Sequence, residues 1–361
     1  MTNPPLLSVV LPNHNHAKLI GRALTALLAQ TRAADEIIII DDGSTDDSMR
    51  VIAQFAAKSP SINVQVNDKS LGVIPTLERG LQMARGRYIY FAAADDWVLP
   101  GFFDRALARL QANPDLGLFC GEALLVDGLS DRAFAVRPAV RPAMRASRIE
   151  AAEVKRLLRE SDNWILTGSA IFRRECVLWA GGLDERLGSY ADGYVARKIA
   201  LKFGFFFEPT LVAAWAVFPD SVSRRTALEL AQTKHMLDIV PRRLAADPAF
   251  PPWYAALFCD RWRFNSCRLA LQSYPIDRTL VLDMGARTPQ ERAVLERMLA
   301  LPSRNLARLA ILARLWQRLK PIALMPLFRT MLAMRRARVA LGFRPWQFRA
   351  KSTIGAEPAD G

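Results

Sequence analysis

The sequence predicts an α/β fold in which a mostly parallel sheet, flanked by helices, is followed by an α-helical C-terminal region. Over about the first 220 residues, short apolar runs rich in β-branched residues alternate with segments whose apolar residues recur at helical spacing. Alternation of this kind favours a doubly wound, Rossmann-like parallel sheet. Beyond residue 220 the pattern is helical to the end, with prolines as the main interruptions.

The strands and helices of the first part can be assigned in order. Residues 6–11 and 36–40 are predicted strands, and the spacing of Leu24, Leu27 and Leu28 indicates a helix between them, at 17–31. The further predictions are strands at 62–66, 88–91, 116–123, 164–172 and 205–218, helices at 49–58, 71–84, 102–112, 151–159, 173–180 and 194–203, a loop at 129–148, and a flexible acidic segment at 183–193.

The composition is that of a globular protein with a packed core. Of 361 residues, 51% are hydrophobic and 23% are charged. The four cysteines are scattered without a C-x-x-C pair, which fits a reducing compartment. The N-terminus lacks a basic region typical of a signal peptide, and no apolar run reaches the roughly 18–20 residues of a spanning helix. We therefore expect a cytoplasmic protein.

The net charge of +14 is placed entirely in the C-terminal part. Residues 1–220 carry 25 Lys+Arg and 25 Asp+Glu, whereas residues 221–361 carry 24 Lys+Arg and 10 Asp+Glu. A neutral first part and a basic second part indicate different partners. We expect three regions: a catalytic domain at 1–220, a basic helical region at 221–349 and a flexible tail at 350–361.

Two predicted strands end on paired acidic residues. Asp41 and Asp42 follow the strand at 36–40, and Asp95 and Asp96 follow the run at 88–91. Since parallel strands bring their carboxyl ends to one edge of a sheet, the two pairs should converge there. Acidic side chains at such an edge suit a divalent cation and, through it, a diphosphate. The alternative is a pair of loops with solvated acids.

The motifs of the first part also resemble a known family. Over about residues 6–220 the chain is similar to family 2 glycosyltransferases of the GT-A fold, which transfer a sugar from a nucleotide-diphospho-sugar with inversion. The resemblance is carried by SVVLPNHNHAKLIGRALTALLAQT, EIIIIDDGSTDDS, LGVIPTLERGLQMARGRYIYFAAADDWVLP, TGSAIFRRECVLWAGGLDERL and SYADGYVARKIALKFG, in this order.

The resemblance implies roles for residues that bind the donor nucleotide. The loop with Pro12, His14 and Asn15 would lie against the base, Asp42 would pair with the base edge, and Asp95 would contact the ribose. The donor is expected to be a UDP-sugar and the acceptor a saccharide or lipid-linked hydroxyl. Cell-envelope or exopolysaccharide assembly is the family's commonest setting.

The resemblance further implies a metal ligand and a general base. Asp96 would hold a divalent metal, Mn²⁺ or Mg²⁺, on the diphosphate, and Asp192 matches the position of the base that takes the acceptor's proton. Read without the family, Asp192 before a helix is a typical N-cap.

Several positions depart from the family pattern. Ala93 and Ala191 replace frequent acids, His14 replaces a Tyr, Leu77 stands where an Arg is common, and Phe218 stands where a late His can complete the metal shell. The alternative function is therefore a catalytically weakened nucleotide-sugar-binding or scaffolding protein on the same fold.

The basic C-terminal region contains an amphipathic segment. Arg304, Arg308, Arg314 and Arg318 fall within an arc of about 120° on one helix face. Opposite them lie Leu306, Leu309, Leu312, Trp316 and Leu319, and residues 322–341 repeat the mix. Residues 304–341 suit an anionic membrane surface, which would make the protein peripheral on the inner face of the membrane. The alternative is a helical subdomain that packs on the core. Because no recognised motif accompanies the charge, we expect no nucleic-acid partner.

Overall fold

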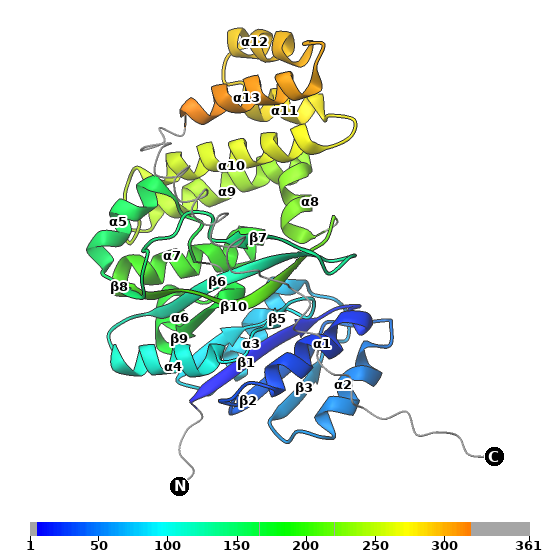
Figure 1. Cartoon of the computed structure of the whole chain (residues 1–361), viewed down its shortest axis with the longest axis vertical. Coiled ribbons are helices and arrows are strands. Elements are labelled where there is room, and N and C mark those ends of the chain that lie inside the picture. The colour runs from blue at the N-terminus through cyan, green and yellow to red at the C-terminus, as the bar shows by residue number, and fades with distance from the viewer. Residues whose placement is uncertain (1–5, 166, 220, 319–361) are drawn as a thin grey trace, which may run out of the picture.

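The computed structural model describes residues 6–165, 167–219 and 221–318. Its described strands form one mixed sheet with the main order β3-β2-β1-β4-β9-β6-β10-β5, while β7 pairs with β6 and β8 with β10 (Figure 1). The strands are β1 (Leu7–Asn13), β2 (Glu36–Asp41), β3 (Ile62–Val66), β4 (Tyr88–Phe91), β5 (Trp97–Val98), β6 (Leu118–Asp127), β7 (Ala133–Arg137), β8 (Ser147–Ile149), β9 (Ala170–Arg173) and β10 (Phe205–Val217).

Helices cover both faces of this sheet, as the alternation of motifs predicts. Strands β3, β2, β1 and β4 pair in parallel, whereas β9 is antiparallel to both β4 and β6. Side chains of β1 alternate between the faces, so that Val9 packs in one apolar cluster and Val10 in the other. The helices of this part are α1 (Ala17–Leu28), α2 (Ser48–Ala56) and α4 (Phe102–Ala112) on one face, and α3 (Val73–Met83), α5 (Ala151–Glu160), α6 (Arg174–Ala180) and α7 (Ala191–Phe203) on the other.

Two of the segments predicted in this part differ from the structure. The predicted loop at 129–148 contains β7, which forms a hairpin with β6, and β8, which pairs with the beginning of β10. The predicted strand at 164–172 contains instead a 3₁₀ turn, η1 (Thr167–Ser169), before β9 begins. For β7 and β8, pairing with distant strands decides the backbone, and the local composition carries no signal of it.

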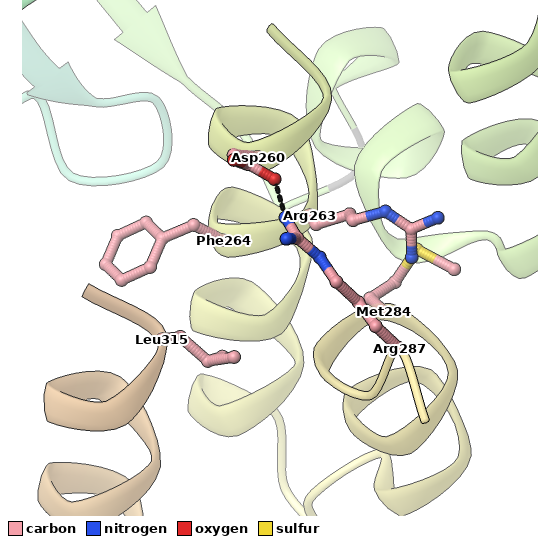
Figure 2. A pocket seen from close by; sticks show the side chains of 6 residues that line it. All are labelled: Asp260, Arg263, Phe264, Met284, Arg287 and Leu315. Atoms are coloured by element: carbon pink, nitrogen blue, oxygen red, sulfur yellow. Dashed lines mark hydrogen bonds and ion pairs between the residues drawn. The ribbon is translucent and has the colours of Figure 1, made fainter. Parts of the chain in front are cut away.

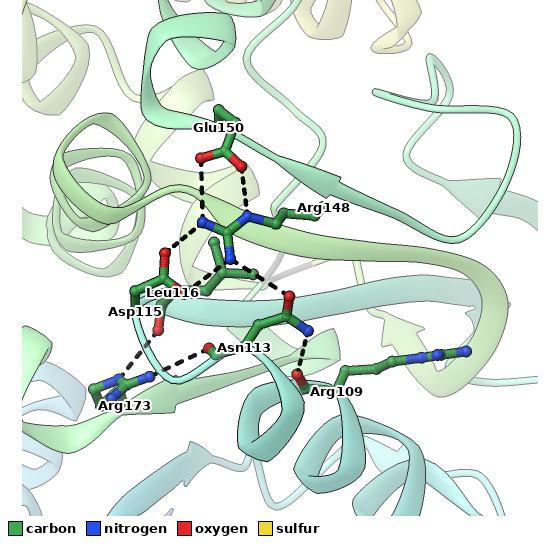
Figure 3. Close-up of polar contacts among 7 residues, drawn as sticks. All are labelled: Arg109, Asn113, Asp115, Leu116, Arg148, Glu150 and Arg173. Atoms are coloured by element: carbon green, nitrogen blue, oxygen red, sulfur yellow. Dashed lines mark hydrogen bonds and ion pairs between the residues drawn. The ribbon is translucent and has the colours of Figure 1, made fainter.

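Arg148 ties β8 to the loop that precedes β6 (Figure 3). Its guanidinium donates to Asp115 and Glu150, with Nη1 2.8 Å from Asp115 Oδ1. Beneath it, Nε of buried Arg173 donates to the carbonyl oxygen of Leu116 at 3.1 Å. These contacts close the edge of the sheet opposite the acidic strand ends.

The C-terminal helices extend the molecule away from the sheet (Figure 1). Met236, Val240 and Phe258 belong to the same apolar cluster as α7, so this part of the helical region shares its core with the sheet domain. A separate cluster, which includes Cys267 and Leu295, joins the later helices. The helices are α8 (Val222–Leu228), α9 (Leu230–Ala246), α10 (Tyr254–Gln272), α11 (Arg278–Gly285), α12 (Pro289–Leu299) and α13 (Arg304–Arg318).

A small cavity of about 10 Å³ lies where α10, α11 and α13 meet, beside the ion pair of Asp260 and Arg287 (Figure 2). It has room for at most one water molecule. None of the described helices combines the length and the apolar character that crossing a membrane requires. Residues 319–361, which include the predicted second amphipathic segment and the tail, lie outside the described part of the chain.

Candidate active site

The carboxyl ends of β1 and β2 are joined by a buried polar cluster. Asp41 Oδ1 accepts hydrogen bonds from Asn13 Nδ2 at 2.8 Å and from Ser44 Oγ at 2.6 Å. The backbone N–H of Ser44 donates to the other oxygen of Asp41 at 2.9 Å. Because Asn13 and Asp41 are the last residues of neighbouring strands, this cluster fixes the two loops that follow.

Asp42 holds a third loop against the same edge. Its carboxylate accepts from Asn67 Nδ2 at 2.6 Å, from Ser70 Oγ at 2.8 Å, and from the N–H groups of Leu71 and Gly72, each at 2.9 Å. Burial opposes its charge, but these four donors lower the pKa of Asp42 to about 2. In the described structure, then, all four lone-pair positions of this carboxylate face protein donors.

The loop with Pro12, His14 and Asn15 lies over this cluster. His14 Nδ1 is 2.8 Å from the carbonyl oxygen of Asp42, which can only accept, so Nδ1 carries the proton. Asn15 has a φ of 55° and its Oδ1 accepts from the N–H of Thr45 at 2.8 Å. Both side chains are exposed, so the loop presents polar groups and a ring at the sheet edge.

Asp95 and Asp96 follow β4 at the same edge. Asp96 is buried, and its Oδ1 accepts from the N–H of Ala216 in β10 at 2.8 Å. Burial, and then the neighbouring charge of Asp95, raise the pKa of Asp96 well above its ordinary value, against the opposing effects of Ala216 and Arg22. Arg22 of α1 donates to the carbonyl oxygen of Asp95 at 3.3 Å and stacks 3.8 Å from the ring centroid of Trp97.

The 3₁₀ turn η1 connects Asp96 to Asp192. A Cβ built on Gly168 would lie 3.7 Å from Asp96 Oδ2, and the carbonyl oxygen of Gly168 accepts from the Tyr90 hydroxyl at 3.0 Å. The adjacent Thr167 donates its hydroxyl to Asp192 Oδ2 at 2.7 Å. Two successive residues of one turn thus lie beside the two carboxylates: Thr167 is hydrogen-bonded to Asp192, and Gly168 is adjacent to Asp96.

Asp192 lies within α7 rather than on the flexible segment predicted before it. The 3₁₀ helix η2 (Glu185–Tyr190) leads directly into α7, whose N-cap residue is Tyr190. Asp192 therefore sits in the first turn, where its Oδ1 accepts from the N–H of Gly193 at 2.6 Å. It is not the N-cap of this helix, and the helix N-terminus favours its negative charge.

A buried network supports the first turn of α7 from behind. Arg197, almost fully buried, donates from Nη1 to the carbonyl oxygen of Gly193 at 2.8 Å and from Nη2 to that of Asp162. The carboxylate of Asp162 accepts from the Tyr254 hydroxyl at 3.0 Å and pairs with Arg261 at 3.1 Å. Helix α10 therefore helps to position the turn that carries Asp192.

Sequence comparison identifies the family that this arrangement belongs to. Residues 8–165 match the model of glycosyl transferase family 2, and an uncharacterized glycosyltransferase of Nostoc sp. is 33% identical over 112 residues. Residues 8–165 therefore belong to glycosyl transferase family 2. The match with the Nostoc protein covers 31% of this chain and 35% of that protein.

Other proteins are similar to this chain over different lengths. An uncharacterized protein of Mycobacterium tuberculosis is 26% identical over 312 residues, which cover 84% of this chain and 92% of that protein. The chondroitin synthase of Escherichia coli is 32% identical over 116 residues, which cover 32% of this chain and 16% of the synthase. The chain therefore spans only a small part of that larger enzyme.

Solved structures establish the fold. S. aureus TarS 1–349 in complex with UDP-GlcNAc matches with a TM-score of 0.58 and 14% identity over 92% of each chain. The mannosyltransferase PcManGT from Pyrobaculum calidifontis, in complex with GDP-Man and Mn²⁺, matches with a TM-score of 0.53 and 18% identity over 87% of each chain. The chain has the GT-A fold.

The donor set of this family 2 chain fits a divalent cation held jointly with a diphosphate. Among the described residues no protein donor reaches Asp96 Oδ2, and the nearby charge of Asp95 would favour a cation there. No cluster of three or more His, Cys, Asp or Glu side chains occurs in the described chain. One or two carboxylates, completed by phosphate oxygens and water, are the usual Mg²⁺ arrangement.

Some residues of this site were not identified from the sequence. Asn67 and Ser70 bind Asp42, and Arg79 in turn donates to Asn67 Oδ1. Asn67 directly follows the parallel strand β3, so the rule that identified the acid pairs could have found it. By contrast, Leu77 packs in the core, and the Phe218 ring lies against Gly128 of the β6–β7 hairpin.

Proposed function

We propose that this protein is an inverting glycosyltransferase that moves a sugar from a nucleotide-diphospho-sugar, a UDP-sugar by preference, to an acceptor hydroxyl. The observation that carries the proposal is the turn η1, in which Thr167 donates to Asp192 and the next residue, Gly168, lies beside Asp96. The leaving diphosphate and the base must lie on opposite sides of one sugar, so the two carboxylates need a common support.

In this proposal the donor lies along the edge formed by β1, β2 and β4. The loop with Pro12, His14 and Asn15 receives the base, Asp42 recognises its polar edge, and Asp95 meets the ribose. Since Asp42 already accepts four protein hydrogen bonds, a bound base would replace one of them. Ser70 is the donor that can leave most easily, because a hydroxyl rotates freely whereas backbone N–H groups do not.

Asp96, with Asp95 nearby, would hold the divalent cation, Mn²⁺ or Mg²⁺. When bound, the cation would offset the charge that develops on the leaving diphosphate. Asp192 would take the proton of the acceptor hydroxyl while that oxygen attacks the sugar from the opposite face. The hydroxyl of Thr167 fixes the orientation of the Asp192 carboxylate.

The test is donor binding and turnover by the full chain with a panel of nucleotide-sugars, with and without Mn²⁺. We expect metal-dependent binding of a UDP-sugar and slow donor hydrolysis. Asp96→Asn should weaken the metal-dependent binding, whereas Asp192→Asn should keep donor affinity and lower turnover by roughly 10² or more. Binding without turnover would favour the alternative, a nucleotide-sugar-binding or scaffolding protein. No binding of any nucleotide would exclude both.

The remaining expectations belong to the same proposal. A cytoplasmic enzyme of cell-envelope or exopolysaccharide assembly would meet its saccharide or lipid-linked acceptor at the inner face of the membrane, with residues 304–341 as the peripheral contact. A catalytic domain at 1–220, a basic helical region at 221–349 and a tail at 350–361 remain the proposed division, although α9 and α10 share the core of the first part.

A further inference from the structure

A cleft that is separate from the candidate active site opens beside α7, away from the sheet edge that carries the acidic residues. It has a volume of about 640 Å³ and is formed by α5, α6, the later turns of α7, and the segment from α9 to α10. We call it the lysine cleft, after its charged and aromatic lining of Lys155, Lys198, Lys202, Arg243, Asp247 and Trp179. It shares no residue with the candidate active site.

The charge of the lysine cleft is strongly unbalanced. Four basic side chains and one carboxylate line it, a formal surplus of three positive charges. Asp247 is already occupied, because Lys198 Nζ lies 2.8 Å from its Oδ2 and the Tyr194 hydroxyl donates to the same oxygen. Lys155 and Lys202 are exposed, and within the described chain no carboxylate lies within ion-pair distance of either.

Trp179 adds an aromatic surface to this positive cleft. Its side chain is 43% exposed, although one edge packs on Phe203 with ring centroids 4.9 Å apart. Lys198 Nζ lies 5.3 Å from the Trp179 ring centroid. An exposed aromatic ring beside cations provides a flat apolar surface for the CH groups of a sugar ring and charges for its acidic substituents. An inorganic phosphate or a simple anion would leave the ring unused.

We propose that the lysine cleft binds an anionic saccharide, a sugar chain that carries carboxylate or phosphate groups. The proposal rests on the proposed function in one respect: such a chain would be the acceptor or the product of the transfer. Lys198 and Lys202 follow Asp192 by six and ten residues on α7, about 9 and 15 Å along the helix axis. The cleft would therefore hold the chain at a distance from the end that receives the sugar.

The experiment is calorimetric titration of the full chain, at low ionic strength and without donor or metal, with a hexasaccharide of galacturonic acid. We expect it to bind, and neutral maltohexaose to bind at least ten times more weakly. Lys155→Gln and Lys202→Gln should each weaken binding roughly three- to tenfold, as expected for charge-assisted contacts at a surface. Trp179→Ala should weaken it roughly tenfold. Lys58→Gln, on an exposed lysine at the end of α2, is the matched control and should change nothing.

Four results would overturn the inference. The first is no binding of the acidic hexasaccharide by the parent chain, and the second is a Lys58→Gln variant that weakens binding as much as Lys202→Gln. The third is equal binding of polyphosphate by the parent and by Trp179→Ala, which would define a plain phosphate site. The fourth is binding of anionic phospholipid vesicles through Lys155 and Lys202, which would define a membrane contact. Nucleotide binding is measured in parallel: if it fails while the hexasaccharide binds, the proposed function fails and the lysine cleft stands.

Discussion

Asp42 is a carboxylate whose charge is maintained by the loop that it organises. Its four hydrogen bonds come from residues 67–72, and together they lower its pKa from 3.8 to about 2 despite burial. A pKa that is lower in the folded state than in the unfolded chain contributes stability above the unfolded value, and the contribution is lost as the pH falls through the folded value.

Asp42→Asn should therefore destabilise the fold in a pH-dependent way. We expect a loss of about 2 kcal/mol in the free energy of unfolding at pH 7, which shrinks by roughly half at pH 3. Urea unfolding of the parent and the variant at both pH values measures it. Asp68→Asn, an exposed neighbour on the same loop, is the control and should show no such pH dependence. A loss that is equal at both pH values would mean that the charge of Asp42 contributes nothing.

Thr167 offers a test of the proposed base that leaves its carboxylate in place. Thr167→Val removes the hydroxyl that donates to Asp192 and keeps the shape of the side chain. We expect turnover to fall roughly tenfold, since a base held by one fewer hydrogen bond spends less time in the reactive orientation, while donor affinity stays unchanged. Steady-state kinetics with a saturating donor measures it, with Thr25→Val on α1 as the control. Unchanged turnover would contradict the role of Thr167.

The residues of the candidate site were predictable where they directly follow parallel strands. Asp42 and Asp96 could be placed at one edge from the strand pattern alone. Thr167 and Gly168 could not, because their role depends on a 3₁₀ turn inside a segment that reads as a continuous strand. Arg197 was missed for a related reason: its partners Gly193 and Asp162 meet it only through tertiary packing.

At the scale of the element, two helical glycines differ in how closely neighbouring side chains pack against them. A Cβ on Gly80 of α3 would lie 2.3 Å from Val10 Cγ1 in β1, whereas on Gly21 of α1 the nearest atom would be Val51 Cγ1 at 3.7 Å. The first glycine lets α3 lie directly on the sheet, and the second has ordinary space around it.

Gly80→Ala and Gly21→Ala should therefore change stability in opposite directions. An alanine gains roughly 0.5–1 kcal/mol over glycine inside a helix. At Gly21 we expect that gain, whereas at Gly80 overpacking should outweigh it and leave a net loss of about 1–2 kcal/mol. Thermal or urea unfolding of both variants gives the comparison. A stabilised Gly80→Ala variant would mean that α3 can move off β1 at little cost.

The elements themselves were predicted best where a local pattern is strong. Helix α4 has the bounds that its apolar spacing predicts, and β2 reads clearly as a buried strand. Strands β7 and β8 were missed because the segment 129–148 that contains them is rich in Arg, Ala and Pro, and only pairing with β6 and β10 makes them strands. The order of the sheet rests on such distant contacts, which no single segment encodes.

At the scale of the whole molecule, α13 packs on the protein through the face that carries its arginines, not only through the face that its sequence pattern predicts to be apolar. Ala307, Ile311 and Leu315 are buried, and they lie within the arc of the arginines. Arg304 also points toward the protein, because it donates to the carbonyl oxygen of Ser273 and its guanidinium carbon lies 5.0 Å from the Tyr274 ring centroid. The described arginines of this arc thus flank the packed side of the helix. On the predicted apolar side, Leu306 is 52% and Leu309 is 67% exposed, whereas Leu312 and Trp316 pack on the neighbouring helices.

Any membrane contact of this region should therefore depend on the exposed leucines as well as on the charge. Each Lys or Arg near an anionic surface contributes about 1 kcal/mol, and each fully buried leucine roughly 1.5–3 kcal/mol. Replacing Arg304 would also remove its contacts at the end of α10. A change in vesicle binding could then not be separated from a change in the stability of the fold. Substituting Leu306 and Leu309 avoids this problem, because neither side chain belongs to the packed cluster.

The variant that carries both Leu306→Gln and Leu309→Gln should co-sediment less with anionic vesicles than the parent, and high salt should weaken the parent's binding as well. Nucleotide affinity should stay the same, because α13 lies far along the molecule from the sheet edge that carries Asp42 and Asp96 (Figure 1). Leu129→Gln, on a still more exposed leucine of the β6–β7 hairpin, is the control and should leave vesicle binding intact. If the parent does not sediment with vesicles even at low salt, α13 only completes the helical core. If the double variant loses nucleotide binding instead, the C-terminal helices contribute to the donor site itself.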